Sequence, residues 1–341
     1  MRFQYQILKD HEEKMKPYKP PCSAKEIPVI DLTDSYSGDL EKRKRVAREI
    51  HKTCCDTGFF YVSNHTVPQK MMDAHLTLAT EFFKLPTEEK QALDSANEGS
   101  TRGYEAMVVP VLNEGLPPDL KEGFMSSVDT DEDHIYTKLN VPVTGRNQWP
   151  ASIPEFQTKY EAYVNQVLKL GRHLAQMLAL SLELPENYFD ECLKEPLHYS
   201  RILRYPPHRK DAAPNQLSAG THTDWGLLTI LLQDNNAGLE VQNTDGEWIS
   251  APPIPGTYII NLGEMVRVIT NGLYKATPHR VLNNNSGNTR YSAPVFFDPE
   301  YFYKVKCAPT CMPEIGDPKF PEMTAGEHLR SMFEKSFGAN T

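Results

Sequence analysis

Apolar residues follow helical spacing through the first half of the chain. In residues 39–57, Val46, Ile50 and Cys54 recur every four positions, which predicts an amphipathic helix that ends at Gly58. The same spacing predicts further helices at about 67–83, from about Pro86, at 153–183 and at 324–337. The helix over 153–183 has the most continuous apolar face, and we expect it to brace a sheet from outside.

From about residue 199 short runs of β-branched, aromatic and Leu residues alternate with turn signals such as Asp245-Gly246 and Pro255-Gly256. These runs predict strands at 227–232, 238–243, 257–261, 275–282 and 290–297. Many short strands at this interval suggest a jelly-roll double sheet.

We therefore expect an α+β, mainly β chain, with a double-stranded β-helix (jelly-roll) core, flanking helices and a helical N-terminal portion. Residues 1–198 would form the N-terminal helical and strand region with the bracing helix, packed on the core. Residues 199–341 would form the jelly-roll domain and a C-terminal helix. Residues 1–25 are polar and contain prolines, so we expect an arm over the body.

The composition indicates a globular chain with a large core. Of 341 residues, 39% are hydrophobic, enough for one large domain or two. The net charge of −9 argues against a nucleic-acid partner, because counterion release requires clustered Lys and Arg. No apolar run approaches the length of a membrane span and residues 1–6 lack the apolar core of a secretory peptide, so we expect a cytoplasmic protein with no membrane partner.

The cysteines indicate no structural zinc site. Their spacing includes no Cys-x-x-Cys pair, and without a secretion signal we expect all of them to be reduced thiols. They are Cys22, Cys54, Cys55, Cys192, Cys307 and Cys311.

The chemistry of the chain is concentrated in His222-Thr223-Asp224 and in a later histidine, His279. Successive side chains alternate faces in an extended segment, so His222 and Asp224 would project together while Thr223 points away. Two imidazoles and one carboxylate suit a six-coordinate Fe(II), because they leave three positions for other ligands and O2. We predict that His222, Asp224 and His279 bind iron and carry the catalysis.

A second pair, Arg290 and Ser292, follows His279 within the strand predicted at 290–297. Both side chains would lie on one face of the strand. A guanidinium fork and a hydroxyl fit one carboxylate, held by charge-assisted bidentate bonds. That carboxylate would belong to a small diacid.

These residues carry a family resemblance that also extends upstream, over Ile27–Leu32, Gly58–His65, Arg102-Gly103-Tyr104 and Leu203–Pro207. The chain resembles the isopenicillin N synthase-like branch of the Fe(II)/2-oxoglutarate-dependent dioxygenases, from about residue 26 to 335. The resemblance implies the same jelly-roll fold, with Fe(II) as metal and with 2-oxoglutarate and O2 as cosubstrates.

By resemblance, 2-oxoglutarate would chelate Fe(II) through its C1 carboxylate and 2-keto oxygen, while Arg290 and Ser292 hold its C5 carboxylate. Tyr205 matches a tyrosine that lies beside that distal carboxylate in related sequences. Arg201 matches a position that reaches the cosubstrate in ethylene-forming relatives, although a surface role is equally open. Plant-type members carry Asn where this chain has Leu203, which removes one expected polar contact.

The resemblance also suggests a substrate pocket. Phe296 falls at a position that often stacks on a flat substrate, and four further residues are candidates for completing the pocket, although aromatic residues beside strands are usually core. The four are Trp225, Arg102, Tyr104 and Met107. Such a pocket would accept a mixed apolar and polar small molecule, such as a secondary metabolite or a nucleobase.

The predicted activity is oxidation of a small organic molecule, by hydroxylation or desaturation, with release of succinate and CO2. We expect a monomer or weak homodimer. Three alternatives stay open: an oxidase that does not use 2-oxoglutarate, as isopenicillin N synthase and aminocyclopropane-carboxylate oxidase do not; an ethylene-forming enzyme; and a non-catalytic metal-binding scaffold.

Overall fold

The computed structural model describes residues 20, 22–94, 102–107, 119–142, 144–207, 216–284 and 287–337. Its helices are α2 (Leu40–Asp56), α3 (Gln69–Phe83), α4 (Thr87–Ala92), α5 (Ile135–Lys138), α6 (Phe156–Ser181), α7 (Glu264–Ile269) and α8 (Ala325–Phe337). Its strands are β1 (Val29–Asp31), β2 (Phe59–Ser63), β3 (Gly103–Glu105), β4 (Glu122–Asp129), β5 (Thr144–Gly145), β6 (Leu197–Tyr205), β7 (Ala219–His222), β8 (Leu228–Gln233), β9 (Leu239–Gln242), β10 (Trp248–Ser250), β11 (Tyr258–Leu262), β12 (His279–Val281), β13 (Arg290–Asp298), β14 (Lys304–Val305) and β15 (Met323–Thr324).

Two sheets form the core of the jelly roll. The larger has the strand order β1-β2-β11-β8-β13-β6-β4-β3, with β5 beside β4, and the smaller has the order β10-β9-β12-β7. Side chains from both sheets meet in one apolar cluster, which places the sheets face to face. Its members include Phe59, Leu203 and Ile259 from the larger sheet and Ala219, Val241 and Val281 from the smaller.

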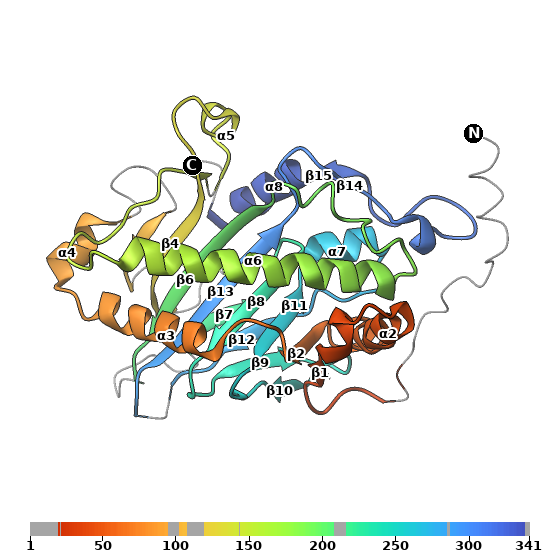
Figure 1. The fold of residues 1–341 in the computed structure, drawn as a ribbon, viewed down its shortest axis with the longest axis horizontal. Coiled ribbons are helices and arrows are strands. Elements are labelled where there is room, and N and C mark those ends of the chain that lie inside the picture. Colours follow the sequence, from red (N-terminus) through yellow and green to blue (C-terminus); the bar gives the residue numbers. More distant parts are fainter. Residues whose placement is uncertain are drawn as a thin grey trace.

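Helices cover the other face of the larger sheet. In Figure 1, α6 runs across this sheet with α3 and α2 beside it. Gly171 of α6 sits directly on the Phe297 ring, where an added Cβ would lie 3.0 Å from the ring carbons, so the helix approaches β13 closely. The helix expected at 153–183 therefore braces the sheet from outside, as predicted. No helix in these described segments is long and apolar enough to cross a membrane.

The two halves of the chain share the larger sheet. β2 pairs with β11, and β4 pairs with β6, so N-terminal strands lie on both sides of the jelly-roll strands. The division expected at residues 198/199 falls inside β6, and strands from both sides of it are hydrogen-bonded together. The strand expected at 275–282 spans only His279–Val281, because Pro278 has no N–H to donate to a neighbour. Most of the arm expected at 1–25 lies outside the described residues.

One histidine under α6 makes stability sensitive to acid. His75 of α3 is stacked on Tyr163 and lies edge-on to Tyr160, and its buried Nδ1 has no hydrogen-bond partner among the described residues. Burial lowers the pKa of His75 from 6.5 to about 3. The unfolded chain therefore binds a proton at this site below the ordinary histidine pKa, where the folded protein does not.

We expect the free energy of unfolding to fall as the pH drops below about 6.5, the pKa of an unfolded histidine. The His75 contribution alone amounts to a loss of about 2 kcal/mol between about pH 7 and about pH 5. Urea titrations at both pH values measure this loss. Between them, the free energy of unfolding of His75→Phe, which keeps a stacked ring, should fall by about 2 kcal/mol less than that of the wild type. Equal pH dependence in the two proteins would mean that His75 takes up its proton in the folded state.

Candidate active site

Three side chains converge in the smaller sheet, at the end of β7. His222 is the last residue of β7, His279 is the first of β12, and the two are cross-strand partners. Asp224 follows His222 by two positions, and Asp224 Oδ1 lies 3.9 Å from His222 Nε2 and 3.7 Å from His279 Nε2. One donor atom from each residue lies within 4.8 Å of the other two. This group, His222, Asp224 and His279, is called the triad below.

Hydrogen bonds from the surrounding chain fix each imidazole of the triad. His222 Nδ1 lies 2.7 Å from the Gly220 carbonyl oxygen, and His279 Nδ1 lies 3.2 Å from that of Thr277. A carbonyl only accepts, so each Nδ1 carries the hydrogen and donates it. Each Nε2 then presents its lone pair to the centre, which is the tautomer a metal requires.

The two oxygens of the Asp224 carboxylate have different neighbours. Thr229 of β8 and Asn261 of β11 both donate to Oδ2, Asn261 at 2.7 Å. Oδ1 is left facing the two histidines. The sequence did not predict the roles of Thr229 and Asn261, although each is a buried polar residue in a largely apolar strand, Leu228–Gln233 and Tyr258–Leu262. A buried polar side chain in such a strand needs a hydrogen-bond partner, and here that partner is Asp224 of the triad.

The triad holds the protonation states that a cation needs. Desolvation, with the neighbouring His279, lowers the pKa of His222 to about 4, so its ring is neutral near pH 7. Burial alone would raise the pKa of Asp224, but the two imidazoles and the Asn261 and Thr229 bonds hold it below its ordinary value. The result is one negative charge and two lone pairs aimed at a common point, a donor set that fits Fe(II).

The turn after Asp224 is held by a further buried carboxyl. Asp298, at the end of β13, accepts from the backbone N–H of Leu227 at 2.7 Å. A Cβ on Gly226 would lie 1.6 Å from the Asp298 carboxylate, so only glycine fits there. Burial raises the pKa of Asp298 to about 7. Asp298 and Gly226 are contacts that the sequence analysis also missed.

Arg290 lies in the same barrel with one of its donors unused. It is almost fully buried, at 1% exposure, and stacks its guanidinium over the Tyr205 ring at 4.7 Å. Nε donates to the Asn236 carbonyl and Nη2 to Gln233 Oε1 at 2.7 Å, while Nη1 is buried with no hydrogen-bond partner in the described chain. A buried charged donor without an acceptor is costly, so this atom fits a bound anion.

Two hydroxyls accompany the guanidinium. Ser292 Oγ and the Tyr205 hydroxyl lie 3.4 Å apart, on neighbouring strands whose register pairs Arg290 with Tyr205. Ser292 and Tyr205 are both buried. The structure thus brings Arg290, Ser292 and Tyr205 together as one carboxylate-sized group of donors, and Leu203 fills the adjacent position with an apolar side chain.

The other cosubstrate candidate, Arg201, is also turned toward the barrel interior, and it forms an ion pair with Glu105 of β3. Phe296 lies parallel to Tyr199 with ring centroids 4.2 Å apart. Trp225 is directed toward α8 instead, packs edge-on against Phe333 and accepts a bond at its carbonyl from His328. Met107 is half-buried just after β3.

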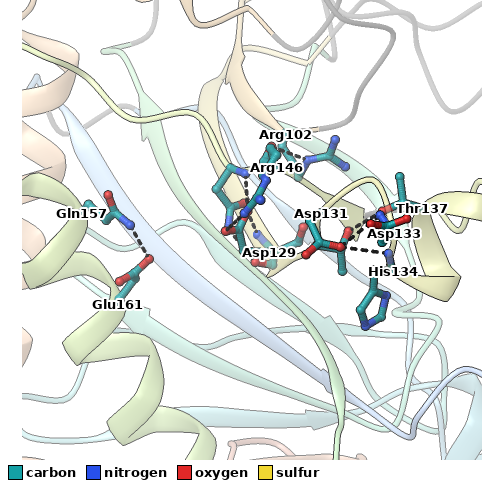
Figure 2. Close-up of polar contacts among 12 residues, drawn as sticks. Arg102, Asp129, Asp131, Asp133, His134, Thr137, Arg146, Gln157 and Glu161 are labelled. Carbon is teal, nitrogen blue, oxygen red and sulfur yellow. Dashed lines mark hydrogen bonds and ion pairs between the residues drawn. The ribbon is translucent and has the colours of Figure 1, made fainter.

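Arg102 and Tyr104, the remaining pocket candidates, make their hydrogen bonds to groups outside the triad. Arg102 Nε donates to the carbonyl of Arg146, and Nη1 donates to that of Thr144 (Figure 2). Tyr104 belongs to the apolar cluster beneath the helices, and its hydroxyl donates to Glu122 Oε2 at 2.7 Å. The reason is strand parity, because the residue that faces the barrel on this short strand is Glu105, one position later.

Glu122 joins three donors at a buried position. It accepts from Tyr104, from Lys90 Nζ at 2.9 Å and from Arg204. Burial raises its pKa, but these three bonds together hold the pKa below the ordinary value. The cluster links α4 to three strands of the larger sheet, β3, β4 and β6.

We expect Glu122→Gln to lower the free energy of unfolding by about 3–5 kcal/mol, because Lys90 would remain charged and buried without its counter-ion. Denaturant titration measures the loss. Glu155→Gln, which breaks an exposed pair with Lys159, should leave stability unchanged. A loss below about 1 kcal/mol in Glu122→Gln would show that water replaces the missing charge.

Comparison with known proteins decides the family. Residues 27–152 match the family described as non-haem dioxygenase in morphine synthesis N-terminal, and residues 196–299 match the 2OG-Fe(II) oxygenase superfamily. The chain is 34% identical to the 2-oxoglutarate-Fe(II) type oxidoreductase hxnY of Emericella nidulans, over 91% of this chain and 90% of that protein. The chain belongs to the 2OG-Fe(II) oxygenase superfamily.

Solved structures agree with this assignment. A full-length Neurospora crassa protein in complex with alpha-KG superposes on this oxygenase with a TM-score of 0.82 at 25% identity, covering 91% of this chain and 96% of that one. The same Neurospora crassa protein with alpha-KG and thymine gives 0.81 at 26% identity, covering 91% and 97%. The oxygenase is thus an Fe(II)- and 2-oxoglutarate-dependent dioxygenase with a jelly-roll core that acts on a small molecule.

Proposed function

We propose that this oxygenase binds Fe(II) through His222, Asp224 and His279, and that it hydroxylates or desaturates a small organic molecule while 2-oxoglutarate is converted to succinate and CO2. One observation carries the proposal. The three donor atoms of the triad converge within 4.8 Å, in the same barrel as a buried arginine, Arg290, whose Nη1 lacks an acceptor among the described residues.

The chain's own groups would bind and orient the two reactants. Arg290 Nη1 and the Ser292 and Tyr205 hydroxyls would hold the C5 carboxylate, so that the other end of the cosubstrate reaches the metal. When bound, Fe(II) supplies the activation of O2 and the oxidation of a substrate C–H bond. Thr229 and Asn261 would keep Asp224 to one ligating oxygen, which preserves open positions.

The substrate would lie against the aromatic wall of Phe296 and Tyr199. Two parallel rings with a 15° interplanar angle form a flat apolar surface, which suits a planar or small cyclic molecule. The Neurospora crassa complex with thymine is a structural neighbour that holds a planar base. We place the reaction in the cytoplasm, where the six free cysteines would stay reduced.

An anaerobic titration with Fe(II) and 2-oxoglutarate tests the binding half of the proposal, because chelation produces a weak visible charge-transfer band. Admission of O2 with a panel of small molecules then tests the reaction. We expect one class of compound to stimulate succinate release in proportion to its own oxidation. Ethylene in the headspace, or oxidation of substrate without succinate, would contradict the proposed reaction.

A further inference from the structure

An ion pair inside the barrel is separate from both the triad and the Arg290 group, and it joins Arg201 to Glu105. Arg201 of β6 donates from Nη2 to Glu105 Oε2 of β3. Both side chains lie over Gly123, where an added Cβ would come within 2.6 Å of Glu105 Oε2 and 3.5 Å of Arg201 Nη2. Leu203, a member of the cluster between the sheets, lies over the same glycine, which places the pair on the inner face.

The pair retains hydrogen-bonding capacity on both partners. Arg201 Nε is buried with no partner among the described residues, and the Arg201 side chain keeps 24% of its surface exposed. Glu105 receives its bond on Oε2, and 21% of its side chain is exposed. An arginine has five N–H donors and a carboxylate has several acceptor sites, so a ligand can bond both while the ion pair stays intact.

The cross-strand register places Arg201 between the metal and the cosubstrate anchor. Tyr199 is in the same row of the sheet as Thr229, which bonds the triad's carboxylate. Leu203 is in the same row as Ser292. Arg201 lies on β6 between these two rows, and β13 separates β6 from β8 in the sheet. A molecule bound at Arg201 would therefore lie beside the cosubstrate rather than in its place.

The charge of the pair indicates which chemistry it recognises. Glu105 neutralises Arg201, so its repulsion would offset the attraction of a ligand carboxylate to Arg201. A neutral edge with a carbonyl oxygen beside an N–H meets both partners without that repulsion. The parallel Phe296 and Tyr199 rings offer a flat surface next to the pair.

We propose that Arg201 and Glu105 read the amide edge of a small planar lactam or imide, with Arg201 donating to its carbonyl oxygen and Glu105 accepting from its N–H. This assignment names the substrate class of the proposed active site and rests on that proposal. Arg201 and Glu105 are specificity residues here, and Arg290 remains the cosubstrate anchor.

The test measures binding and not turnover. The protein is loaded with Mn(II) and 2-oxoglutarate, and calorimetry gives the dissociation constants of 2-pyridone, of 1-methyl-2-pyridone, which lacks the N–H, and of benzoate, a planar anion. We expect wild-type protein to bind 2-pyridone at least about tenfold more tightly than either of the others, since a site built for a hydrogen bond rejects a ligand that leaves its groups unpaired.

Removing one charge should reverse the preference. Glu105→Leu frees the Arg201 guanidinium, so benzoate should bind at least about tenfold more tightly than to wild type. The double variant Glu105→Leu/Arg201→Leu should bind all three probes within about twofold of one another. Arg146→Leu is the matched control. It breaks the exposed pair between Arg146, which follows β5, and Asp129 at the end of β4, and it should behave as wild type (Figure 2).

Several results would overturn the inference. They are wild-type binding that favours benzoate, failure of 2-pyridone to bind, and a Glu105→Leu variant with unchanged selectivity. Arg201→Leu that weakens 2-oxoglutarate binding without affecting 2-pyridone would assign Arg201 to the cosubstrate instead. Failure of the wild type to bind metal or 2-oxoglutarate is a different outcome, because it contradicts the proposed function before any probe is added.

Discussion

His222→Ala and Asp224→Ala will each reduce turnover by at least about a hundredfold, because removal of one of three protein ligands weakens metal retention and distorts the open positions. The fold should survive, since the triad lies at the end of β7 and outside the main apolar clusters. The measurements are iron stoichiometry after gel filtration, 2-oxoglutarate-dependent succinate release, and the denaturation midpoint.

The control for these variants is His134→Ala, which changes a histidine at the start of α5 (Figure 2) and should retain full iron content and activity. Thr229→Val should give an intermediate result, a loss of about 10–100-fold in metal affinity, because it removes one of the two hydrogen bonds to Asp224 Oδ2 without removing a ligand. Stoichiometric iron and near wild-type turnover in either alanine variant would show that the triad is not the iron site.

Arg290→Leu will weaken the apparent affinity for 2-oxoglutarate by at least about tenfold while iron binding stays intact. The substitution removes a charge-assisted contact from a desolvated carboxylate, a loss of roughly 2–5 kcal/mol. The anaerobic charge-transfer titration measures the affinity. Arg290→Lys should recover only part of it, because a point charge cannot reproduce the guanidinium fork held by Gln233 and Asn236.

Ser292→Ala should show a smaller loss in the same titration, because one neutral hydrogen bond is removed and the charge remains. An unchanged titration in Arg290→Leu would mean that another residue anchors the C5 carboxylate. Those two variants together separate the charge contribution of the site from its hydroxyl contribution.

The sequence predicts the centre of the site better than its rim. Arg290 and Ser292 are two positions apart in β13, and Asp224 follows two positions after His222, the last residue of β7, so the alternation of side chains in extended chain predicts that each pair shares a face. Tyr104 was assigned to the pocket and lies on the opposite face. Residues 102–105 contain polar and apolar side chains in no alternating order, so nothing in that short strand indicates which face is inward.

Positioning residues were harder to predict, because their roles depend on pairings distant in the chain. Asp298 bonds Leu227 only because β13 lies beside β8 in the sheet. Glu105 meets Arg201 only because β4 separates β3 from β6 and Gly123 leaves the space. The longer helices were predicted well because their periodicity is local, whereas the short helices α5 and α7 were not predicted. The insertion of β2 beside β11 is a long-range contact that no local pattern encodes.

The shared sheet governs how the chain can fold. β11 is flanked by β8 and by β2, and β6 is flanked by β13 and by β4, so a fragment starting near residue 196 would leave two long strand edges unpaired. During synthesis β2 can pair with β1 at once, but its other partner, β11, exists only after residues up to Leu262 have emerged. We therefore expect folding of the jelly roll to be slow, because it depends on contacts distant in the chain, and to leave strand edges exposed to chaperones or to aggregation in the meantime.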